Sequence, residues 1–118
     1  MTKIVSQIET ALQKKQIVNS FSTSENSIKI DADFKYISKI SIDVNTNEMN
    51  LVTDITLHII SIDKRIAEEY ILIYPHEFTS KVDLIGKIFS KITNYNRQIG
   101  EKIEALRRQL NLFGDDNE

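Results

Sequence analysis

The chain has 118 residues, of which 41% are hydrophobic and 27% charged, with a net charge of -2. This length and composition are typical of one soluble globular domain. The small net charge excludes a general attraction to nucleic acid or anionic lipid, and the absence of cysteine excludes disulfides and thiolate chemistry. No segment resembles a signal peptide or reaches membrane-spanning length, so we predict a cytoplasmic protein that does not contact the membrane.

Residues 1–18 carry apolar side chains at helical spacing, separated by polar ones. The apolar positions are Ile4, Val5, Ile8, Ala11 and Leu12. We therefore predict an N-terminal amphipathic helix over 1–18 that covers part of a sheet. The next segment, 19–27, is rich in serine, asparagine and threonine, which favour turns, and it predicts a loop.

Residues 28–75 contain several stretches in which apolar and polar side chains alternate, as expected for strands with one buried face. Short polar turns separate these stretches, which indicates antiparallel neighbours, because parallel strands need a longer crossover. Pro75 ends the last stretch. The segment predicts an antiparallel sheet of three to four strands.

Residues 80–113 hold the longest apolar periodicity, with steps of three or four residues, and predict a long C-terminal helix. Its N-cap would be Ser80, with Thr79 as the alternative. About 34 residues would form a rod of roughly 50 Å, whereas a compact domain of this size is only about 35 Å across. Either the helix extends beyond its own domain, or it breaks within 94–100, where asparagines and Gly100 weaken helical preference. An acidic tail, 114–118, follows.

The expected fold is a single α+β domain over 1–118, with the long C-terminal helix packed on the sheet and extending beyond it. From Tyr95 onward the apolar stripe of that helix narrows to roughly 80° of its circumference, which is closer to a coiled-coil seam than to a face packed on a sheet. We therefore predict a homo-oligomer. Its self-association residues would be Tyr95, Ile99, Ile103, Leu106, Leu110 and Phe113.

Groups that carry chemistry are sparse, and no motif for a catalytic, metal or cofactor site is present in the sequence. The two histidines are His58 and His76, and His58 lies about 13 Å along its strand from Asp54, too far for joint action. The acids Glu68 and Glu69 fall on opposite faces of the last predicted strand. We predict no enzymatic activity, no cofactor and no metal site.

Two kinds of partner remain. The first is another protein, bound by an inhibitor or adaptor of the kind carried by phages and mobile elements. Tyr70 and Tyr74 share one strand face and could contact a protein or stack on nucleic-acid bases, although tyrosines in such a row are more often half-buried in the core. The alternative is a dimeric nucleic-acid-binding protein that uses Lys87, Arg97 and Arg108 on the basic face of the C-terminal helix. Residues 81–113 contain seven basic and three acidic side chains, although a solvated helix face also explains such a pattern. The layout is similar to that of small dimeric nucleoid-associated proteins, without any of their motifs.

Overall fold

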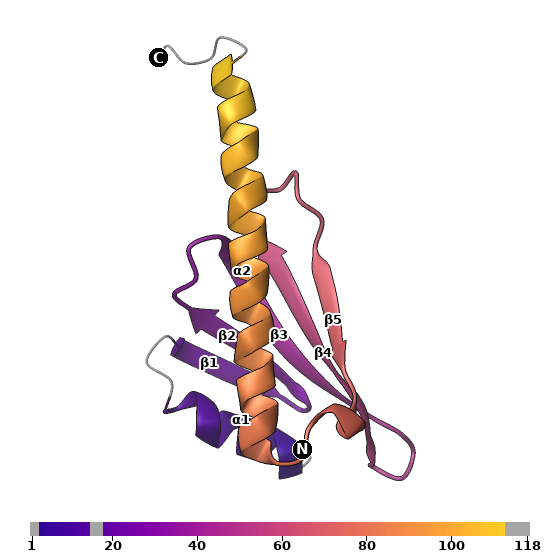
Figure 1. Cartoon of the computed structure of the whole chain (residues 1–118). Helices are drawn as coiled ribbons and strands as arrows, with labels where there is room; N and C mark the ends of the chain where they lie inside the picture. Colours follow the sequence, from indigo (N-terminus) through magenta and orange to yellow (C-terminus); the bar gives the residue numbers. More distant parts are fainter. Residues whose placement is uncertain (1–2, 15–17, 113–118) are drawn as a thin grey trace.

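The computed structural model describes residues 3–14 and 18–112 (Figure 1). Two α-helices lie on one face of an antiparallel sheet, and a short 3-10 helix precedes the second of them. The elements are α1 (Lys3–Leu12), β1 (Val18–Ser24), β2 (Ser27–Ala32), β3 (Ile37–Thr46), β4 (Val52–Ser61), β5 (Glu69–Ile73), η1 (Pro75–Glu77) and α2 (Lys81–Leu112). This arrangement confirms the predicted α+β class.

The five strands form a meander in the order β1-β2-β3-β4-β5, and each is antiparallel to the next. The register aligns buried side chains across the sheet, with Ile28 opposite Ile42 and Ile42 opposite Leu57. All three are fully buried on the face that the helices cover. The other face carries polar side chains and is open.

The prediction of three to four strands was too low, because the segment 19–27, predicted as a loop, contributes β1. Phe21 lies opposite Ile30 and Thr23 opposite Ile28, so pairing with β2 overrides the turn preference of the serines. A two-residue turn with Glu25 at a φ of 53° is all that remains of the loop. The predicted helix over 1–18 was too long, since α1 ends at Leu12 and residues 15–17 lie outside the described ranges.

The long helix α2 runs without interruption through 94–100, so the predicted break is wrong and the overhanging rod is observed (Figure 1). Its 32 residues span about 48 Å, and the molecule measures 58 × 26 × 24 Å. Ser80 caps the helix as predicted, because its Oγ accepts a hydrogen bond from the N–H of Asp83 at 3.1 Å. The end predicted at 113 and the tail 114–118 lie outside the described ranges.

Tyr36, in the connection between β2 and β3, holds the middle of α2. Its backbone N–H donates to Oδ1 of Asn96 at 2.9 Å, and its hydroxyl donates to Oε2 of Glu104 at 3.0 Å. Between these two bonds its ring lies against Gly100, where an added Cβ would come within 2.6 Å of Cδ2 of Tyr36. Asn96, Gly100 and Glu104 follow one another at steps of four, so they form one stripe of the helix. Asn96 and Gly100, the two weak helix formers, are thus sites of tertiary contact.

Candidate functional site: a tyrosine strip on the edge strand

The open face of the sheet carries large exposed side chains along and directly after β5, its edge strand. Tyr70 is 59% exposed, and Leu72 and Tyr74 are each 44% exposed. Their alternation with Ile71 and Ile73 explains the placement, because Ile73 is fully buried toward the helices and its neighbours must face the other way. We name Tyr70, Leu72 and Tyr74 the tyrosine strip.

Both tyrosines of the strip stack on histidines. His58 of β4 lies directly opposite Tyr70, with ring centroids 4.4 Å apart and planes within 3°. His76 of η1 stacks on Tyr74 at 5.9 Å and 10°. Stacking restricts the ring rotamers, so a partner that contacts the strip would meet side chains that are already ordered.

His58 also contacts Glu68, with Nε2 2.5 Å from Oε1. The sequence alone does not predict this pair, because the contact depends on the register between β4 and β5. Within the described ranges no group of three or more histidine or carboxylate side chains is placed to hold a metal ion. Because the pair lies on an open face, the arrangement suits contact with a macromolecule better than acid–base chemistry, which benefits from a water-excluding cleft.

The connection that leads into β5 is fixed by an ion pair between Asp63 and Arg65. The Nη2 of Arg65 lies 2.6 Å from Oδ2 of Asp63, and the backbone N–H of Arg65 donates to Oδ1 at 2.9 Å. These two hydrogen bonds from Arg65 lower the pKa of Asp63 to about 2. Asp63 is therefore ionised at neutral pH, as the ion pair with Arg65 requires.

A depression of about 590 Å³ continues the open face from His58 toward β1. Lys29, Lys39 and Asp31 contribute charges of both signs, and Ile60 contributes apolar surface. A mixed surface of this kind is typical of the rim of a protein interface. The strip and the depression together form one continuous face.

Half of the predicted self-association residues are buried in the core of their own chain. Tyr95 is 6% exposed, Ile99 3% and Ile103 1%, all in the cluster that α2 forms with the sheet. Burial raises the pKa of Tyr95, as does the nearby charge of Glu69. Leu106 is half-buried, and the side chains of Leu110 and Phe113 lie outside the described part. Three of the six residues are therefore buried within their own chain.

The predicted basic contacts are spread along α2. Lys87 is half-buried, whereas Arg97 and Arg108 are exposed. Acidic side chains lie among them, since Glu101 is 4.0 Å from Arg97 and Glu104 is 3.1 Å from Arg107. The outer face of the helix is thus of mixed charge and not a continuous basic patch.

No family model matches this chain, and neither a curated protein nor a solved structure matches it. Among the described residues, no helix is both long and apolar enough to cross a membrane. Any function must therefore be inferred from the geometry of the sites.

Proposed function

We propose that this chain is a small non-enzymatic protein-binding module, of inhibitor or adaptor type, and that the tyrosine strip is its contact surface. The observation that supports this proposal is the exposure of Tyr70 and Leu72 on an edge strand and of Tyr74 directly after it. Natural edge strands usually carry charges or bulges that discourage association, and these three side chains do the opposite. Exposed tyrosines are also among the residues that contribute most to binding at protein interfaces.

The backbone of β5 suits the same purpose. β5 pairs with β4 on one side, and no strand of the described ranges lies on its other side. Its outward N–H and C=O groups are therefore available to a strand of a partner, which would add to the sheet edge. A strand added there would place its alternate side chains beside the tyrosine strip.

The strip is tested by replacing Tyr70 and Tyr74 together with alanine. Loss of two interface tyrosines should weaken binding of a captured partner roughly 100-fold or more. The measurement is quantitative affinity capture from the native host, followed by a binding titration with the protein that is enriched. The matched control replaces Glu48 and Thr53, which are exposed but lie outside both the strip and the depression, with alanine. If the tyrosine variant is folded by circular dichroism and retains the same partner with wild-type affinity, the strip is not the contact surface.

We further propose that copies of the chain associate through the end of α2. Support comes from the overhang of the helix, whose last turns extend beyond the sheet in Figure 1. Leu106 is only half-buried by its own chain, and the sequence places Leu110 and Phe113 farther along the same stripe. Apolar side chains on an overhanging helix gain free energy when a second copy covers them.

The alternative function, nucleic-acid binding, is favoured by the exposure of Arg97 and Arg108 on α2. It predicts retention of DNA or RNA in a low-salt gel shift, with an affinity that falls steeply as salt rises, because phosphate contacts release counterions. Reversing the charge of Lys87, Arg97 and Arg108 should abolish that retention. Absence of retention by the wild-type chain at low salt would remove this alternative.

A further inference from the structure

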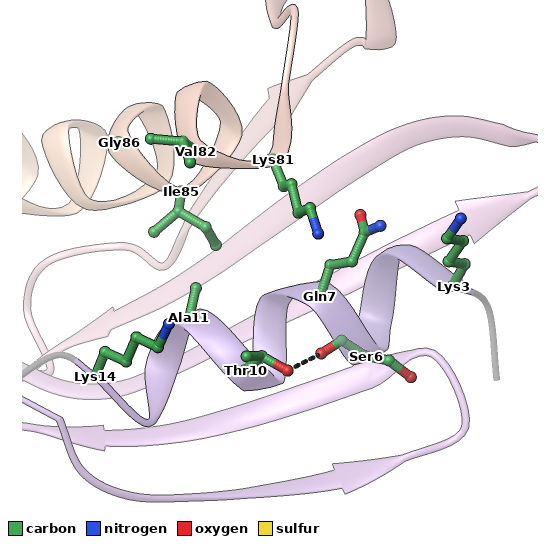
Figure 2. Close-up of a pocket in the computed structure, with 10 residues that line it drawn as sticks. All are labelled: Lys3, Ser6, Gln7, Thr10, Ala11, Lys14, Lys81, Val82, Ile85 and Gly86. Carbon is green, nitrogen blue, oxygen red and sulfur yellow. Dashed lines mark hydrogen bonds between the residues drawn. The ribbon is translucent and has the colours of Figure 1, made fainter.

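A groove of about 780 Å³ separates α1 from the first turns of α2 (Figure 2). Ala11 and Ile85 point toward one another between the helices and form its apolar floor. Val82 lines the same groove and is 82% exposed, more than any other large hydrophobic residue of the described ranges. A Cβ added at Gly86 would meet nothing within 4 Å, so the space above this turn of α2 is empty. The floor of the groove is therefore apolar.

Positive charge surrounds this apolar floor. Lys3, Lys14 and Lys81 line the groove, and no acidic side chain among residues 3–14 and 18–112 does. None of the three lysines forms an ion pair within the described part of the chain. The nearest acids in sequence are used elsewhere, since Glu9 accepts a hydrogen bond from Thr23 of β1 and Asp83 accepts one from the N–H of Thr79. The groove therefore complements a segment that combines apolar and acidic side chains.

We propose that the occupant of this groove is residues 112–118 of a second copy of the chain. That segment reads Leu-Phe-Gly-Asp-Asp-Asn-Glu, so two apolar side chains are followed by three acids. The apolar pair can pack on the apolar side chains of Ala11, Val82 and Ile85. The three acids equal the three lysines in number and are opposite to them in charge. The inference rests on the self-association proposed above and names its contact.

The occupant must come from another copy, because the chain's own tail cannot reach the groove. Lys81 and Leu112 are 31 residues apart on one continuous helix, a distance of about 46 Å. The six residues 113–118 extend at most about 22 Å, even if they turn straight back. A two-fold pair of molecules with opposed α2 helices places each tail near the groove of the partner, so both grooves are filled and the assembly closes as a dimer.

The test uses two charge-reversed variants of the full chain. The groove variant carries Lys3→Glu, Lys14→Glu and Lys81→Glu, and the tail variant carries Asp115→Lys, Asp116→Lys and Glu118→Lys. Each alone should dimerise roughly 10- to 100-fold more weakly than wild type, because three attractive pairs become repulsive. Mixed in equal amounts, the two variants should form a heterodimer, since each groove then meets a tail of opposite charge. Sedimentation velocity measures the fraction of dimer in each variant alone and in their mixture, and circular dichroism checks that each variant is folded.

A matched control carries Lys29→Glu, Lys39→Glu and Lys64→Glu, which changes the net charge equally at exposed positions outside both the groove and α2. The dissociation constant of its dimer should remain within about threefold of the wild-type value. If the wild type dimerises and the groove variant dimerises equally well, the groove contact is overturned but self-association is not. The copies would then associate through another part of α2. A wild-type monomer at high micromolar concentration overturns both, whereas the role of the tyrosine strip is decided separately by its own capture experiment.

Discussion

Replacing Gly100 with alanine should lower the free energy of unfolding by about 1–3 kcal/mol, although helix propensity alone favours alanine by up to about 1 kcal/mol. The reason is the ring of Tyr36, since an alanine Cβ would lie 2.6 Å from its Cδ2. The ring cannot easily retreat, because hydrogen bonds to Asn96 and Glu104 hold Tyr36 on both sides of the contact. Urea denaturation measures the change.

Gly86 is the matched control, because it lies in the same helix and an added Cβ there would meet nothing within 4 Å. Gly86→Ala should therefore raise the free energy of unfolding by about 0.5–1 kcal/mol, as expected for an exposed helix interior. Opposite signs for the two glycines are the expected result. The same sign at both positions would show that the contact with Tyr36 does not limit packing at Gly100.

A double-mutant cycle isolates the cause. In a Tyr36→Ala background the space beside Gly100 is open, so Gly100→Ala should no longer destabilise the fold. The coupling free energy between the two positions should be about 1–3 kcal/mol, as for residues in direct contact. A cost at Gly100 that persists without the Tyr36 ring would place the strain elsewhere.

The regular part of the fold could be predicted because it depends on local periodicity. The steps of three and four from Ile85 to Leu106 predicted α2, and the alternation around Ile40, Ile42 and Val44 predicted β3. The continuity of α2 could not be predicted in this way. Asn96 and Gly100 are weak helix formers, and the contacts that favour them come from Tyr36, sixty residues earlier than Asn96.

The candidate site was partly predictable for the same reason. That Tyr70 and Tyr74 share a strand face follows from the period of two, and both are exposed in the structure. The contact of His58 with Glu68 depends on the register between two strands, which the sequence leaves open by one or two residues. The strand β1 was missed because serine and threonine favour turns locally, while pairing with β2 decides the conformation.

Replacing Ile103 with alanine should lower the free energy of unfolding by about 2–5 kcal/mol, the usual cost of a cavity in a packed core. Ile103 is 1% exposed in the core of its own chain, so the cost should not depend on protein concentration. The matched variant is Leu106→Ala, one turn farther along α2, where the side chain is only half-buried. Its cost in a dilute, monomeric sample should be smaller, because less apolar surface is lost.

Concentration separates the two positions further. If copies associate through the end of α2, Leu106→Ala should weaken the dimer, and its effect on thermal stability should grow with protein concentration. Ile103→Ala should destabilise the chain equally at low and high concentration, because it removes a contact within one copy. An Ile103 variant that unfolds like wild type when dilute, yet no longer dimerises, would mean that this isoleucine belongs to the seam between copies after all. The narrow apolar stripe of α2 would then be a contact surface between copies, as its width in the sequence predicts.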